Sequence, residues 1–92
     1  MHCTEDELRK IKRSKEDERW LEAIGAHIQK LILEKGYKSP YDFWVQQVGD
    51  EVSRAALNYV LKGRVDVKAT TLRKLALALG VEPKEIFNFK LR

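Results

Sequence analysis

The sequence has few of the features that mark secreted, disulfide-bonded or membrane-embedded proteins. Cys3 is the only cysteine, which excludes a disulfide framework and a cysteine-rich zinc site. The longest uninterrupted apolar run, residues 75–79, is far shorter than a membrane span. The N-terminus carries mixed charge without an apolar core region, unlike a secretory signal. We therefore expect a cytoplasmic protein with no membrane partner.

Residues suited to catalysis or to a built metal site are also sparse. His2 and Cys3 are neighbours and His27 lies far from both, so no third ligand has a recognisable spacing. The chain has no glycine-rich phosphate loop after a strand and no spacing that supports a Ser-His-Asp triad. We expect that the protein is not an enzyme and has neither a metal nor a cofactor.

What the sequence does contain is enough apolar surface for one small core, together with an excess of basic residues. Of the 92 residues, 43% are hydrophobic, and the formal net charge is +4. This length supports one domain rather than two. The charge permits nucleic-acid binding without establishing it, because many soluble domains carry as much.

The N-terminal segment, residues 1–19, is strongly charged and is expected to be an arm or a surface helix that leads into a domain over residues 20–92. Thr4 followed by Glu7 is a possible capping box and Ser14 followed by Asp17 a weaker one, which favours the helix. The segment holds a basic cluster flanked by acidic residues, so two roles stay open: a plain helix, which we favour, or an arm along DNA. The basic cluster consists of Arg9, Lys10, Lys12, Arg13 and Lys15.

Apolar residues at helical spacing predict an all-α chain with helices over residues 20–36, 39–49, 53–63, 70–80 and 83–87. Ser39 followed by Pro40 is typical of a helix start, and Ser53 is a good N-cap. Thr70 or Thr71 is expected to cap the fourth helix. A glycine stands at the end of each of the first four helices.

The helix after Ser53 separates into two faces. Its apolar face consists of Ala56, Leu57, Val60 and Leu61, which we assign to the core. The opposite face carries hydrogen-bonding side chains and a small residue: Arg54, Ala55, Asn58, Tyr59 and Lys62. A basic connection follows, with Arg64 and Lys68. Such a helix can be anchored on one side while the other side contacts a ligand.

These segments carry a resemblance to a known family. Residues 63–81 read GRVDVKATTLRKLALALGV, which is similar to the Gly…Leu-x-x-Leu-Ala-x-Ala-Leu-Gly-Val signature of Cro/C1-type (XRE-family) helix-turn-helix regulators. Residues 53–63, SRAALNYVLKG, resemble the recognition helix of that family, and residues 83–87, PKEIF, resemble its closing helix. The resemblance covers roughly residues 24–87. It implies a five-helix, lambda-repressor-like DNA-binding fold.

Two features depart from the family pattern. The stretch between the second and third helices, which includes Gly49 and Ser53, is longer than in the family. Trp44 or Val45 occupies a position where the second helix usually has a small residue, and a bulky residue there pushes the two helices apart. The apolar face of the third helix is unaffected by either difference.

The resemblance implies that the third helix enters the major groove while the second lies across the DNA backbone. Arg54 then suits a bidentate contact with guanine, Asn58 one with adenine, and Ala55 a thymine methyl. Tyr59 is assigned to a base or a phosphate, with packing against the second helix as the alternative. The expected phosphate contacts are Ser53, Lys62, Arg64, Lys68 and Lys38. For the basic and amide side chains, an ordinary solvated surface is the alternative.

One recognition helix contacts only about half a binding site, so we expect a homodimer on an inverted repeat of double-stranded DNA. The expected dimer interface consists of Leu77, Phe89 and Leu91, whereas Phe87 is expected to close the core of the monomer. The predicted function is that of a small transcriptional regulator of the repressor or restriction-modification controller type. The alternatives are an antitoxin that covers a toxin with its arm or tail, and a helical protein-interaction module without DNA binding.

Overall fold

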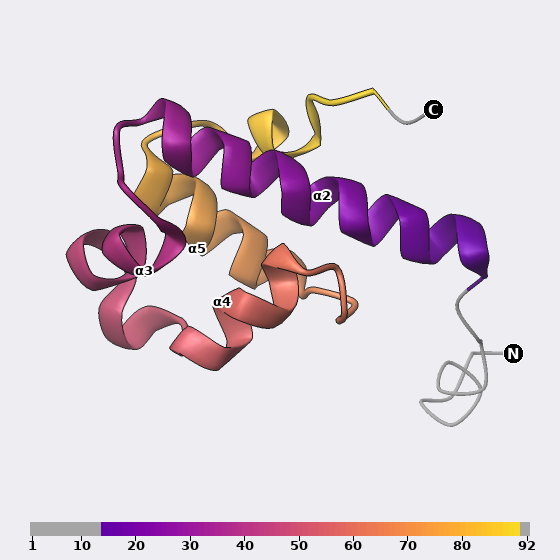
Figure 1. Cartoon of the computed structure of the whole chain (residues 1–92), viewed down its shortest axis with the longest axis horizontal. Coiled ribbons are helices and arrows are strands. Elements are labelled where there is room, and N and C mark those ends of the chain that lie inside the picture. Colours follow the sequence, from indigo (N-terminus) through magenta and orange to yellow (C-terminus); the bar gives the residue numbers. More distant parts are fainter. Residues whose placement is uncertain (1–13, 91–92) are drawn as a thin grey trace, which may run out of the picture.

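The computed structural model describes residues 14–90, and all regular elements in this range are helical (Figure 1). Helix α2 spans Lys15–Glu34, and the short helix α3 spans Pro40–Phe43. The chain continues from α3 through a π-helical turn, Trp44–Val48, and a 3-10 turn, Gly49–Glu51. Helix α4 spans Arg54–Leu61, α5 spans Ala69–Leu79, and a 3-10 turn over Pro83–Phe87 follows. None of these helices is both long and apolar enough to cross a membrane.

The all-α prediction is confirmed, but the count of five α-helices is wrong. The described range holds four α-helices, because the expected fifth is the 3-10 turn Pro83–Phe87. A second difference concerns the start of α5. Neither Thr70 nor Thr71 caps it: the N-cap is Lys68, which makes no side-chain cap, and both threonines lie inside the first turn.

Helix α2 starts earlier than Trp20, at a complete capping box. The Asp17 N–H donates a hydrogen bond to Ser14 Oγ at 3.1 Å, and the Ser14 N–H donates one to Asp17 Oδ2 at 3.0 Å. Residues 15–19 are therefore continuous with the helix that enters the core, as the helical alternative for this segment predicted. The remainder of the charged segment, residues 1–13, and Leu91 lie outside the described residues.

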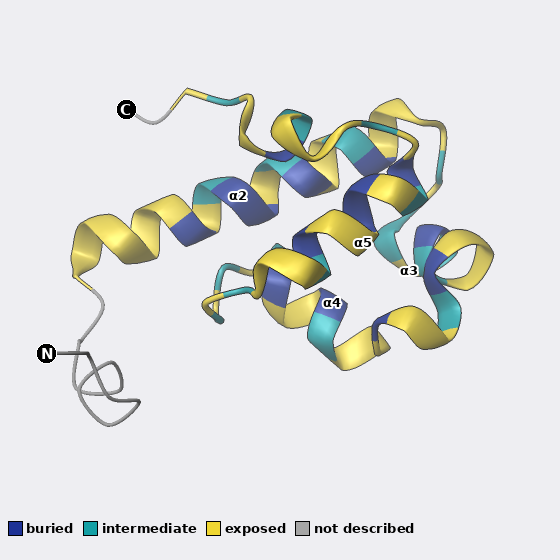
Figure 2. Ribbon diagram, turned by 180° about the vertical axis from the view of Figure 1, so that it is seen from behind, coloured by how far each residue is buried: buried dark blue, intermediate teal, exposed yellow. Residues whose placement is uncertain are grey.

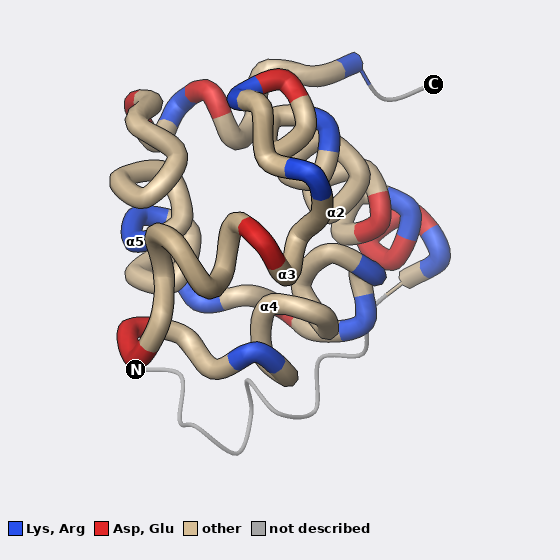
Figure 3. The backbone as a smooth tube through the Cα atoms, turned by 60° about the vertical axis from the view of Figure 1, so that its left-hand side comes forward, with Lys and Arg blue, Asp and Glu red and all other residues tan. Residues whose placement is uncertain are grey.

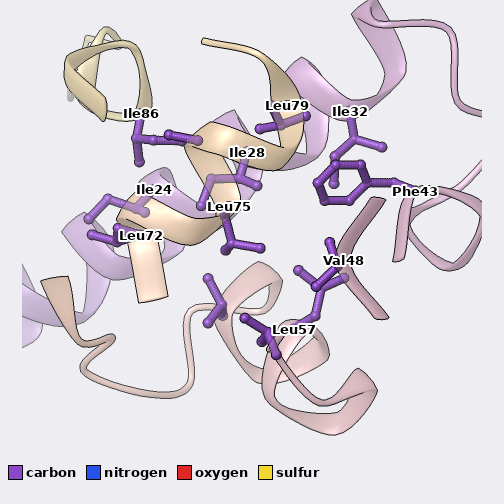
Figure 4. Close-up of a cluster of buried hydrophobic side chains, with 13 residues drawn as sticks. Ile24, Ile28, Ile32, Phe43, Val48, Leu57, Leu72, Leu75, Leu79 and Ile86 are labelled. Carbon is purple, nitrogen blue, oxygen red and sulfur yellow. The ribbon is translucent and has the colours of Figure 1, made fainter. Parts of the chain in front are cut away.

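The centre of the core lies where α2, α3, α5 and the last 3-10 turn meet, and α4 adds Leu57 and Val60 to the same buried cluster. Figure 4 shows side chains of this cluster converging. Burial follows the inner faces of the helices, with exposed residues on the outer faces (Figure 2). No polar or charged residue in the described range is buried. The largest fully buried side chains come from the four elements at the centre of the core: Phe43, Ile24, Ile28, Ile32, Leu75 and Ile86.

Helix α4 is held against α2 by an approach of backbone to backbone. A Cβ added to Gly25 in α2 would stand 2.4 Å from the Leu61 carbonyl oxygen and 2.5 Å from that of Val60. Gly63, just after α4, has a φ of +69°, and a Cβ added there would stand 2.6 Å from the Cα and the backbone N of Glu22. Glycine at both positions lets α4 pack directly on α2, and this contact fixes which face of α4 turns outward.

Candidate nucleic-acid interface

Helix α4 has the two faces that its sequence predicts. The Ser53 Oγ accepts a hydrogen bond from the Ala56 N–H at 3.0 Å, which caps the helix at its expected start. Leu57 and Val60 are buried, with 2% and 4% of their surface exposed, and they anchor α4 in the core. The opposite side is exposed along its whole length, at Arg54, Ala55, Asn58, Tyr59 and Lys62.

The α3 helix begins where Ser39 and Pro40 predict. Ser39 Oγ accepts from the Asp42 N–H at 3.1 Å, and the Asp42 carboxylate accepts from the Lys38 N–H at 3.0 Å. The backbone hydrogen bond from Lys38, together with a hydrogen bond from the side-chain amide of Gln46, holds the pKa of Asp42 below its ordinary value. The stabilisation from a lowered carboxyl pKa is complete at neutral pH and is lost as the pH falls through that pKa.

The longer link between α3 and α4 is taken up by the π and 3-10 turns over residues 44–51. Trp44, one of the two bulky residues considered for the departure from the family pattern, is half-buried in this link, whereas Val45 is exposed. Its indole Nε1–H donates to the Val52 carbonyl oxygen at 2.7 Å. Trp44 therefore ties the second helical segment to the residue that precedes the Ser53 cap, and it fixes how α4 leaves the link.

An aromatic residue that the sequence did not single out lies next to the start of α4. The Arg54 Cζ is 4.3 Å from the centroid of the Tyr41 ring, within the range of a cation–π contact. The Tyr41 ring in turn stacks on Trp44, with centroids 6.1 Å apart and planes at 24°. A pocket of about 210 Å³ between α3 and α4 is lined by Tyr41, Trp44, Arg54 and Asn58 together with Ser39, Pro40 and Leu57.

The predicted phosphate-binding cations stand next to three different helices. Lys62 and Arg64 are exposed just after α4, Lys68 is exposed just before α5, and Lys38 is exposed just before α3. Figure 3 shows how the Lys and Arg positions of the described range are distributed along the backbone. None of Lys62, Arg64 and Lys68 forms an ion pair with another residue in the range 14–90. The structure therefore leaves these three charges available to an anionic partner.

An open hollow of about 710 Å³ separates the first half of α2 from the end of α4, and it mixes charges of both signs. Glu18 and Glu22 line it from α2, opposite Lys62 and Arg64. Tyr59 also lines this hollow, together with Glu18 and Glu22 of α2. The alternative that Tyr59 packs on the second predicted helix, which is α3 in the structure, is therefore not what the structure shows. The carboxylates of Glu18 and Glu22 repel anions, so the hollow itself is less suited to an anionic ligand than the exposed side of α4.

Two of the three residues expected at a dimer interface, Leu77 and Phe89, lie in the described range, and their environments differ. Leu77 is 59% exposed on α5 and is free to contact a partner. Phe89 is half-buried in its own protomer, where its ring lies 5.7 Å from that of His27. The expectation that Phe87 closes the core is wrong, because Phe87 is 44% exposed and stacks on Trp20, while Ile86 is buried instead.

In the described part of the chain, no group of three or more His, Cys, Asp or Glu residues is placed to hold a metal ion. His27 has a structural partner, since its Nε2 lies 2.8 Å from the Glu85 carbonyl oxygen. Comparisons of the chain with models of protein families, with curated proteins and with solved structures find no match.

Proposed function

We propose that the chain binds double-stranded DNA in a sequence-specific way, as a small dimeric regulator of the repressor or controller type. The observation that carries the proposal is the division of α4, with Leu57 and Val60 buried and the side from Arg54 to Lys62 exposed. A helix anchored on one side and open on the other is what insertion into a major groove requires. On this proposal, α3 and α4 form the helix-turn-helix of a lambda-repressor-like fold.

Three side chains on the first turns of α4 are proposed to contact base edges. Arg54 matches the two acceptors of guanine, and Asn58, one turn later, matches the donor and acceptor of adenine. Ala55 is exposed beside them on the same side of α4 and suits the methyl group of thymine. Tyr59, on the side of the hollow near α2, is proposed to reach a base or a phosphate at the edge of the site.

The direct test of DNA binding measures the affinity of the full chain for a duplex of random sequence, about 20–25 base pairs long, across a salt series. A DNA-binding protein loses affinity steeply as salt rises, because its phosphate contacts release counterions. A helical interaction module without DNA binding shows no affinity at any salt concentration, and that result would refute the proposal.

Replacing Lys62 by glutamine is expected to weaken binding to all duplexes alike. Lys62 is proposed to contact a phosphate, so its loss should reduce the slope of log affinity against log salt by about 1. The matched control is Lys30→Gln on α2, since Lys30 already pairs with Glu34 at 3.8 Å and lies away from α4. A loss confined to one DNA sequence would instead assign Lys62 to a base.

The proposed dimer places Leu77 at its interface. Leu77→Glu is expected to shift the protein from dimer to monomer in sedimentation, because a buried, unpaired carboxylate is costly at an apolar interface. Leu33→Glu is the matched control, since Leu33 is comparably exposed, at 53%, but lies on α2. A dimer that survives Leu77→Glu would place the interface elsewhere, and a monomeric wild type would refute dimerisation.

A protein-interaction role is the second candidate, and one observation favours it. Trp20 and Phe87 stack on each other with centroids 5.9 Å apart while 43% and 44% of their surfaces stay exposed. An exposed aromatic pair of this kind is common at protein interfaces. An antitoxin would combine such a surface with the DNA-binding face of α4.

A further inference from the structure

We infer that Tyr41 is a positioning residue that sets the base specificity of Arg54, by holding the guanidinium in the orientation needed to contact a guanine. The inference rests on the proposed DNA binding and adds a residue of α3 to the recognition surface of α4. The base is the guanine already proposed for Arg54, because only guanine offers two acceptors to one guanidinium at the major-groove edge.

The contact between Tyr41 and Arg54 connects the recognition surface to the fold. Arg54 lies over the Tyr41 ring at 4.3 Å, and Tyr41 stacks on Trp44 at 6.1 Å. Trp44 is itself fixed by the hydrogen bond from its indole to the Val52 carbonyl oxygen at 2.7 Å. The position of the guanidinium is thus linked, through two aromatic rings, to the backbone just before the Ser53 cap.

Stacking on an aromatic ring constrains a guanidinium without consuming its hydrogen-bonding capacity. The Arg54 Cζ lies over the Tyr41 ring, and a guanidinium that contacts a ring through its flat face keeps its five N–H groups pointing outward from its edge. The Arg54 guanidinium forms no hydrogen bond or ion pair with any residue in the range 14–90, so these donors are unused there. The edge is therefore available for two parallel hydrogen bonds to a base.

Holding the side chain before DNA binds also reduces the entropy lost on binding. A free arginine side chain has many rotamers, and a bidentate contact selects one of them. Asn58 lines the same small pocket as Tyr41 and Arg54, so both proposed base-contacting groups lie at the junction of α3 and α4. Tyr41 is 51% exposed and contributes little to the core, which leaves positioning as its main effect.

The test compares Tyr41→Ala and Tyr41→Phe, each alone and combined with Arg54→Ala. A duplex is first selected from a random pool by the wild-type chain, and every base pair of that duplex is then substituted singly. Tyr41→Ala is expected to lower discrimination about threefold to tenfold at the one base pair that depends on Arg54, and to leave the others nearly unchanged. Tyr41→Phe keeps the aromatic face and should keep wild-type discrimination.

In the Arg54→Ala background, Tyr41→Ala should have no further effect at that base pair, because the group it positions is gone. A thermal melt of each variant shows that the fold is kept. A uniform loss across all base pairs, or an equal loss in Tyr41→Phe, would overturn the inference and point to a phosphate contact by the phenol.

The two proposals fail in different ways. If the wild type selects no duplex, DNA binding and the role of Tyr41 are both refuted. If the wild type selects a site and Arg54→Ala removes the preference at one base pair, but Tyr41→Ala leaves that preference intact, only the role of Tyr41 is refuted.

Discussion

Replacing Gly25 by alanine is expected to lower the free energy of unfolding by about 2 kcal/mol, and so the melting temperature by roughly 10 °C. The added Cβ would stand 2.4 Å from the Leu61 carbonyl oxygen, and a backbone atom cannot move aside as a flexible side chain can. Alanine is the better helix former by about 1 kcal/mol, so the measured loss is what remains after this gain. Thermal or chemical denaturation measures it.

The control for Gly25→Ala is Ala26→Leu, at the next position of α2. Ala26 is exposed, so the larger side chain should change stability by no more than about 0.5 kcal/mol. If Gly25→Ala were as stable as the wild type, the close packing of α2 on α4 would be wrong, and with it the outward orientation of α4.

Replacing Arg54 by alanine is expected to reduce binding to the selected duplex by about 1–3 kcal/mol and to remove the preference at one base pair. The loss should be much smaller on random duplexes, since Arg54 is assigned to a base rather than a phosphate. Affinity measurements on the selected duplex and on its single base-pair variants separate these two effects.

Two further variants sharpen the Arg54 experiment. Arg54→Lys keeps the charge but loses the planar fork, so the preference for guanine should weaken although general affinity is kept. The control Lys30→Ala removes an exposed cation from α2 and should change neither affinity nor preference. If Arg54→Ala lost affinity equally for every duplex, Arg54 would be a phosphate contact.

Much of the local structure could be predicted because single residues determine it. Ser39 with Pro40 starts α3, and Ser53 caps α4, through hydrogen bonds that depend only on neighbours in the sequence. The buried and exposed faces of α4 follow from helical periodicity in the same way. Helical periodicity therefore predicts which residues from Arg54 to Lys62 are exposed, and the structure confirms this exposure.

The features that were missed depend on contacts between elements. Tyr41 lies thirteen positions before Arg54 in the numbering of the chain, and no local pattern indicates that their side chains meet. Similarly, Thr70 and Thr71 are better capping residues than Lys68, yet α5 starts at Ala69. Gly25 did offer a signal: glycine inside an apolar helical stripe weakens the helix, so it often marks a close approach of another backbone.

The most direct test of the account follows the backbone amide signals of the full chain by NMR as the selected duplex is added. The account predicts that the largest shifts fall on residues 53–62, with smaller shifts at Tyr41 and Arg64, and almost none on the outer face of α2 around Leu33. Shifts centred on α2 or α5, with the signals of residues 53–62 unchanged, would contradict it.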